Sequence, residues 1–340
     1  MVSKIDHIGL WTWGGRVFNW KKYLDNMHIS GMDTVVLWHD KVPVRAQEIQ
    51  GYAHSLNIRV LWGFNWSWNS PVCLNSECDI AEWRDTVLKT IREEYAPVNP
   101  DGICFQVGGT EFGGKCRFDC AVCRKSAANG VGSLFVKFAG GIIDAVKKEF
   151  PDLHISAGAH LGGVHKSFEE LKTLNTSINI MWEDLPGPEN YIEVPFAYNW
   201  DPQETALTNR TIDMVKKMCQ LRGGQEDVAF VVKGFPYRWG GQDPMLLEDF
   251  DLEVLAEVFE KKWSQAAGYC EKRLADALTV FRIIAESPAR SKTAVMLVEH
   301  GLWEYKRYYA AMLINEALHN PFRDPGEVVL ATREKMGLIL

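Results

Sequence analysis

The chain has 340 residues, of which 46% are hydrophobic and 24% are charged, and its formal net charge is −7. This composition is typical of a globular protein that buries a large core. The acidic balance, without a cluster of Lys and Arg, argues against a nucleic-acid partner. No run approaches the roughly 20 apolar residues of a membrane span, and the start of the chain lacks the apolar region of a secretory signal. We therefore expect a cytoplasmic protein with no membrane partner.

Short β-rich runs alternate with helical stretches along most of the chain. The clearest helical period lies in Leu134–Phe150, where apolar residues line one face. This alternation predicts a parallel sheet, and seven or eight such units predict an α/β fold closed into a (β/α)8 TIM-type barrel. The candidate strands are Ile5–Trp11, Thr34–Trp38, Ile58–Gly63, Gly102–Val107, His154–Ala157, Ile178–Trp182 and Val228–Val232.

The eighth strand is the least defined element. Thr293–Val298 fits a strand, but it equally fits the start of a helix that continues through Glu304–Leu318. Because Leu252–Ile284 is also helical in character, we expect a C-terminal helical extension over the barrel. The expected division is a catalytic barrel over residues 1–290 and a helical segment over 291–340, with the last barrel unit as the alternative for that segment.

Hydrogen-bonding, charged and aromatic side chains follow the predicted strands. Parallel-sheet enzymes build their sites at the carboxyl ends of strands. The C–H face of a pyranose packs on a flat ring, and an indole N–H adds a directional donor. The strand ends therefore predict a site for a small-molecule or oligosaccharide substrate. Its expected binding residues are Trp11, Trp13, Trp38, His39, Asp40, Trp62, Asn65, Trp66, Gln106, Thr110, His160, Trp182, Tyr198, Lys233 and Trp239.

Three acidic residues are candidates for catalysis. Glycoside hydrolysis needs an acid that protonates the leaving oxygen and a base or nucleophile on the other side of the sugar. Glu111 follows a strand and a glycine pair, and the neighbouring Phe105 and Phe112 favour a raised pKa for an acid at this position. A surface glutamate that caps the following loop is the structural alternative. The second carboxylate is expected from Glu183 or Asp184, directly after the sixth strand.

The segment Gln106-Val-Gly-Gly-Thr-Glu111 resembles the His-x-Gly-Gly-Asp-Glu strand-four motif of the family 20 β-N-acetylhexosaminidases. Those enzymes are (β/α)8 barrels, and the family 67 α-glucuronidases are related barrels with a strand-four glutamic acid. Gly108, Gly109 and Glu111 match the motif, and the resemblance implies the general-acid role for Glu111. Thr110 replaces the aspartate that orients the substrate's 2-acetamido group, so Glu183 or Asp184 has to act as base or nucleophile.

Cys116, Cys120 and Cys123 form a C-x3-C-x2-C cluster after the fourth strand. A structural zinc fits these three thiolates, with Cys73 or Cys78 on the preceding loop as the fourth ligand. Cysteines without a metal are the alternative. The spacing also matches the radical-SAM iron–sulfur motif, but that motif normally follows the first barrel strand.

These patterns predict an exo-acting glycoside hydrolase that needs no cofactor for catalysis. Lys233 and Arg238, after the seventh strand, suggest that a uronate carboxylate is bound. Three alternatives stay open: a non-catalytic sugar-binding barrel, a radical-SAM enzyme, and a metal-dependent isomerase. The isomerase would use His39, His160, Glu183 and Asp184 as ligands.

Overall fold

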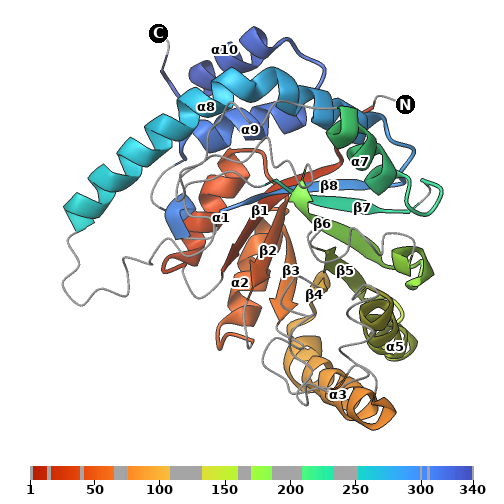
Figure 1. The fold of residues 1–340 in the computed structure, drawn as a ribbon. Helices are drawn as coiled ribbons and strands as arrows, with labels where there is room; N and C mark the ends of the chain where they lie inside the picture. Colours follow the sequence, from red (N-terminus) through yellow and green to blue (C-terminus); the bar gives the residue numbers. More distant parts are fainter. Residues whose placement is uncertain are drawn as a thin grey trace.

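The chain forms a closed barrel of eight parallel strands, seen here in a computed structural model (Figure 1). The structure describes residues 3–13, 17–38, 42–64, 73, 76–107, 132–159, 170–185, 209–224, 226–232, 252–298, 301–304 and 307–338. Each strand pairs with the next one in the sequence, and β8 pairs with β1 to close the barrel. The strands are β1 (His7–Trp13), β2 (Thr34–Trp38), β3 (Arg59–Phe64), β4 (Gly102–Val107), β5 (His154–Ala159), β6 (Asn179–Leu185), β7 (Val228–Val232) and β8 (Lys292–Leu297).

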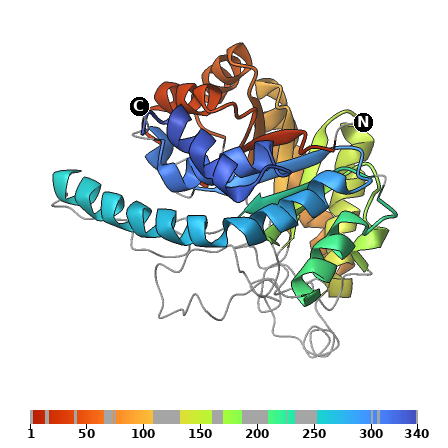
Figure 2. The same ribbon diagram turned by 90° about the horizontal axis from the view of Figure 1, so that it is seen from above.

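The described helices lie on the outside of this barrel (Figures 1 and 2). Short 3-10 segments, η3 (Ala96–Val98), η6 (Glu170–Thr173) and η9 (Gly301–Glu304), and a π-helical turn, η2 (Ile91–Tyr95), complete the order. No helix in the described ranges has the length and apolarity of a membrane span. The α-helices are α1 (Trp20–Ile29), α2 (Ala46–Ser55), α3 (Glu77–Thr90), α5 (Gly132–Glu149), α7 (Asn209–Cys219), α8 (Leu252–Glu286), α9 (Tyr309–His319) and α10 (Pro325–Lys335).

The sequence-based barrel is confirmed, with strand ends shifted by a few residues. β8 begins at Lys292, so the barrel extends past residue 290. The expected helix over Glu304–Leu318 begins only at Tyr309, after the turn η9. In Figure 1, α9 and α10 lie beside α8, whose N-terminal part projects beyond the barrel in Figure 2.

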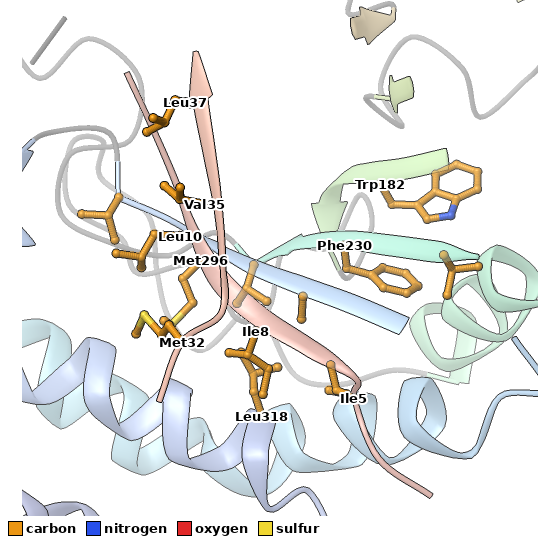
Figure 3. Packing of buried hydrophobic residues seen from close by; sticks show 14 of the residues in the cluster. Ile5, Ile8, Leu10, Met32, Val35, Leu37, Trp182, Phe230, Met296 and Leu318 are labelled. Atoms are coloured by element: carbon orange, nitrogen blue, oxygen red, sulfur yellow. The ribbon is translucent and has the colours of Figure 1, made fainter. Parts of the chain in front are cut away.

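Side chains along the strands divide between two apolar cores. The outer cluster lies between the strands and the helices, and Figure 3 shows part of it, with Leu318 of α9 near Ile8 of β1. The inner cluster fills the barrel. Because successive strand residues point to opposite faces, each strand contributes to both cores. The inner cluster consists of Trp11, Val36, Trp38, Leu61, Cys104, Met181, Ala229, Val231, Val295 and Leu297, with Trp13 packed against it.

Aspartates placed just before strands fix the register at the N-terminal end of the barrel. In three cases, the carboxylate accepts a backbone N–H from the neighbouring strand. A charged acceptor makes a strong hydrogen bond with a backbone N–H, and a slip by one residue would break it. The three bonds join Asp6 to Lys292 N at 3.0 Å, Asp33 to Ile8 N at 3.1 Å and Asp101 to Val60 N at 2.7 Å.

The same end of the barrel carries half-buried polar groups around Arg59 and His154. The Arg59 guanidinium donates to Thr34 Oγ1 at 3.0 Å and lies close enough to three carboxylates, of Asp33, Asp101 and Asp227, for their charges to offset part of its burial. Burial, and then the positive charge of Arg59, lower the pKa of His154 to about 4. His154 is therefore neutral at pH 7 in the folded protein.

Candidate active site

Three tryptophans from β1 and β2 gather at the carboxyl end of the barrel interior. The ring centroids of Trp11 and Trp38 lie 6.0 Å apart with the rings stacked at 26°. Trp13 meets Trp11 edge to face at 5.2 Å and 88°, and meets Trp38 at 6.0 Å and 77°. Such pairs add roughly 0.5–1.5 kcal/mol beyond area burial. These three residues, the indole cluster, form a rigid aromatic wall inside the barrel.

A glycine on β3 makes room for the Trp38 ring. Gly63 pairs in register with Trp38 on one side and with Cys104 on the other. A Cβ atom at position 63 would lie 2.4 Å from the Cε3 atom of Trp38, which is too close for a real contact. The glycine therefore lets the indole lie across β3 toward β4.

Glu183 is the candidate catalytic carboxylate within the described residues. It lies on β6 two residues after Met181 of the inner cluster, and it is 4% exposed. Burial raises the pKa of the Cys104 thiol well above its usual range, and the negative charge of Glu183 raises it further. Because Cys104 on β4 belongs to the inner cluster, this interaction places Glu183 within electrostatic range of the barrel interior. Its position matches the carboxyl-end location expected of a barrel active site.

A β-bulge interrupts the pairing of β6 with β7 at the position of this carboxylate. Trp182 pairs with Phe230 and Leu185 pairs with Val232, so β6 has one more residue than β7 between these pairs. The extra residue places Glu183 and Asp184 opposite the single position of Val231. Bulges of this kind are common beside active sites, where they redirect a side chain. The sequence could not reveal it, because an extra residue leaves no mark on an apolar strand.

The rim after β1 is tied to the rim after β8 by a buried glutamate. Glu304 in η9 is 3% exposed, and its Oε2 atom accepts the backbone N–H groups of Phe18 at 2.9 Å and Asn19 at 2.5 Å. Asn26 Nδ2 donates to the carbonyl of Trp303 at 2.6 Å, which attaches α1 to the same turn. This clamp joins residues far apart in the chain, and no local pattern in the sequence indicates it.

Two tryptophans expected in the substrate site pack in the outer cluster and not with the inner one. Trp62 and Trp182 are fully buried in the outer cluster, between the strands and the helices. The indole of Trp62 donates to Gln50 Oε1 of α2 at 2.8 Å. Trp182 and Phe230 appear on neighbouring strands in Figure 3. Their neighbours on the same strands, Leu61 and Glu183, take the inward positions.

Most other predicted site residues lie outside the described ranges. Asp184 and Gln106 lie in β6 and β4, where the structure describes the backbone but not their side chains. Gln106 pairs in register with Gly158 of β5. The remaining predicted residues lie outside the described ranges: His39, Asp40, Asn65, Trp66, Thr110, Glu111, Cys116, Cys120, Cys123, His160, Tyr198, Lys233 and Trp239.

The two cysteines proposed as a fourth zinc ligand are both described. Cys73 is buried, and its backbone N–H donates to the Asp79 carboxylate at 2.9 Å. Cys78 is exposed in the first turn of α3. Within the described ranges, no group of three or more potential ligands could hold a metal ion. The zinc site therefore stays a prediction.

Comparisons with known proteins identify the fold. No family model matches the chain, and no curated protein matches it. Among solved structures, a GH138 enzyme targeting pectin rhamnogalacturonan II is 12% identical, with a TM-score of 0.51 over 99% of this chain and 42% of that chain. A family 39 glycoside hydrolase from Bacteroides cellulosilyticus WH2 is 11% identical, with a TM-score of 0.51 over 94% of this chain and 65% of that chain.

A β-galactosidase from Marinomonas ef1 is 8% identical, also with a TM-score of 0.51, over 95% of this chain and 61% of that chain. The chain thus spans less than two thirds of the length of each of these three structures. At such low identity, the similarity shows a shared barrel fold. The specific resemblance to families 20 and 67 is not confirmed by it.

Proposed function

We propose that this chain is an exo-acting glycoside hydrolase whose site occupies the carboxyl end of the barrel interior. One observation carries the proposal: a buried carboxylate, Glu183, lies on β6 at a bulge, and its charge acts on Cys104, a member of the inner cluster that also contains Trp11 and Trp38. A carboxylate beside flat aromatic rings suits a sugar, because the rings pack on its C–H face while the acid reacts at the anomeric carbon. The barrel shared with several glycoside hydrolases supports this assignment.

The proposed reaction needs two carboxyl groups in different protonation states. Glu111 gives its proton to the glycosidic oxygen as the bond from that oxygen to the anomeric carbon breaks. Glu183 either takes a proton from the attacking water or attacks the anomeric carbon itself. In the second case, water then hydrolyses the glycosyl ester and Glu111 recovers its proton. Asp184, next to Glu183 in the bulge, is the alternative for this second role.

The test begins with hydrolysis of a panel of 4-nitrophenyl glycosides by the full chain. We expect Glu111→Gln to lower the rate by at least about a hundredfold on the best substrate, since general acid–base catalysis contributes roughly 10²–10⁴-fold. Glu149→Gln is a matched control, because this glutamate pairs with Arg92 on the outer surface. A wild-type rate in Glu111→Gln, or no turnover of any glycoside, would contradict the proposal.

The stereochemistry of the product then separates the two roles of the second carboxylate. Proton NMR of the first sugar released reports retention or inversion at the anomeric carbon. Retention requires carboxyl groups about 5 Å apart and a nucleophile, whereas inversion requires roughly 6.5–9.5 Å and a base. The hydrolysis rates of Asp184→Asn and Glu183→Gln show which residue is the second carboxylate. We expect the larger loss of rate in Glu183→Gln.

A further inference from the structure

An exposed aromatic ring lies at the carboxyl-end rim, between β1 and α1. Phe18 is 67% exposed, and it directly precedes Asn19, the N-cap residue of α1. A hydrophobic residue at this position often packs against the fourth residue of the helix, here Tyr23. Tyr23 is fully buried and meets Trp20 edge to face at 5.9 Å, whereas most of the Phe18 side chain stays in water. The fold therefore forgoes most of the roughly 1.5–3 kcal/mol that burial of this ring would contribute.

The backbone that carries this ring is held from several sides. The preceding residue, Val17, is buried in the outer cluster. The buried carboxylate of Glu304 accepts the backbone N–H groups of Phe18 and Asn19, and the Asn19 side chain accepts Lys22 N at 3.0 Å. A ring on a fixed backbone has only two side-chain torsions to order when it meets a ligand. Phe18 is thus a preorganised apolar surface.

The position of Phe18 places it beside the proposed site. Val298 N donates to the carbonyl of Trp11 at 2.9 Å, so the pairing of β8 with β1 continues up to this rim. The chain from Trp13, in the indole cluster, to Phe18 covers five residues, which span at most about 18 Å when fully extended. A short oligosaccharide with one sugar at the indole cluster can reach that far.

A second exposed phenylalanine shows what distinguishes Phe18. Phe322 is 48% exposed, but it follows α9, whose last residue, His319, contacts the carbonyl of Gly31 at 3.1 Å. Gly31 lies between α1 and β2, at the N-terminal end of the barrel. Sites in barrels of this kind lie at the carboxyl end, so Phe18 is placed for a substrate and Phe322 is not.

We propose that Phe18 is a specificity-determining residue whose ring packs on the C–H face of a sugar in the leaving group, so that the preferred substrate is an oligosaccharide. The inference rests on the proposed function for the location of the site, and it adds the class of substrate. In an exo-acting hydrolase, the terminal sugar enters the site and the leaving group extends toward the rim. The ring of Phe18 stays accessible at that rim.

The test compares a long substrate with a short one, on the full chain. The long substrate is the best of a panel of trisaccharides: cellotriose, laminaritriose, maltotriose, mannotriose, chitotriose and trigalacturonate. The short one is the glycosyl fluoride of its terminal sugar, in the same anomeric configuration, whose leaving group carries no sugar. We expect Phe18→Ala to raise KM for the trisaccharide about tenfold, the factor that corresponds to 1.4 kcal/mol, with kcat unchanged. Both constants for the fluoride should stay at the native values.

Two further variants control for the chemistry and the place of the ring. Phe18→Tyr keeps an aromatic ring and should retain the native KM. Phe322→Ala removes an exposed ring at the other end of the barrel and should change neither substrate. An unchanged KM for the trisaccharide in Phe18→Ala would overturn the inference, whether or not gel filtration shows a change in oligomeric state. An equal loss on the trisaccharide and the fluoride would also overturn it, because Phe18 would then act on the fold of the site.

These outcomes are separable from the fate of the proposed function. If no trisaccharide is hydrolysed, calorimetry measures binding of the same panel. Binding that Phe18→Ala weakens about tenfold, without hydrolysis, would contradict the hydrolase and leave the sugar contact of Phe18 in place. Hydrolysis with a KM that is indifferent to Phe18 would contradict the inference alone, and neither binding nor hydrolysis of any trisaccharide would contradict both.

Discussion

The two ends of the barrel interior use polar groups in opposite ways. At the N-terminal end, carboxylates accept backbone N–H groups of neighbouring strands, and Arg59 and His154 lie within a hydrogen-bonded network. At the carboxyl end, a buried carboxylate and an unpaired indole donor lie among apolar side chains. In barrels of this kind, the first arrangement serves stability and the second serves chemistry. Changes at the two ends should therefore separate stability from binding and activity.

Loss of Asp101 should give the largest change in stability. Its carboxylate accepts hydrogen bonds from Val60 N, from Gln50 Nε2 at 2.8 Å and from the His54 imidazole at 2.9 Å. Asp101→Ala leaves the Val60 donor unpaired, and we expect the free energy of unfolding in urea to fall by about 3 kcal/mol. Sugar affinity of the folded fraction should not change.

Asp85→Ala is the control for this variant, because Asp85 is an exposed residue paired with Arg84 on α3. Its effect should stay within about 0.5 kcal/mol. If Asp101→Ala were as stable as this control, the N-terminal carboxylates would not hold the strand register, and the contrast between the two ends would fail.

Acidification should lower the free energy of unfolding through protonation of His154, at the N-terminal end of the barrel. Its pKa is about 4 in the folded protein, mainly because of burial, against about 6.5 in an unfolded chain. Stability contributed by the neutral imidazole is therefore complete above pH 6.5 and is lost as the pH falls from 6.5 toward 4. The loss amounts to about 3 kcal/mol. His154→Gln removes this contribution, so its free energy of unfolding should depend less on pH over this range than that of the native protein.

Urea unfolding of both proteins at pH 7 and pH 4.5 measures this difference in pH dependence. The native protein and His154→Gln share all acidic residues, so the contribution of those residues cancels in the comparison. Parallel pH dependence in the two proteins would show that His154 is not held neutral by the network.

A methyl group on β3 should disturb the carboxyl end. In Gly63→Ala, the new Cβ atom would meet the Trp38 ring, which has to shift. We expect a loss of about 2 kcal/mol in stability from overpacking, with weaker sugar binding because the indole cluster is displaced. Gly51→Ala on α2 is the matched control: apart from its chain neighbours and its own helix backbone, no described atom lies within 4 Å of the added Cβ. That change should raise stability by about 0.5–1 kcal/mol, since glycine weakens a helix interior. If Gly63→Ala bound sugar with the affinity of the native protein, Trp38 would not be part of the binding site.

The sequence predicted the barrel better than it predicted the faces of its strands. Apolar runs between helices located the strands, including Thr34–Trp38 and Val228–Val232. Strands of a parallel barrel are buried on both sides, so alternation of apolar and polar residues does not tell which side is the interior. For that reason the sequence pattern does not separate Trp62 and Trp182 from Trp11 and Trp38. Packing against α2 and the other outer helices decides the question, and it depends on contacts distant in sequence.

For the candidate carboxylate too, the sequence indicates a position at a strand end but not the three-dimensional arrangement. The position of Glu183 and Asp184 at the end of a strand was readable from the sequence, because an acidic pair follows an apolar run. The bulge that places both residues opposite Val231 depends on the register between β6 and β7. The Glu304 clamp likewise depends on closure of the barrel through β8. Long-range pairing, rather than local propensity, determines these features.

The most direct test of the account is the effect of Glu183→Gln on catalysis and on binding in the same preparation. We predict that kcat for the best 4-nitrophenyl glycoside falls by at least about a hundredfold, the scale of a lost acid–base or nucleophilic group, while the Kd for the released sugar changes by less than about threefold. Hydrolysis by Glu183→Gln at the rate of the native protein would contradict the assignment of this carboxylate, and with it the location of the active site at the indole cluster.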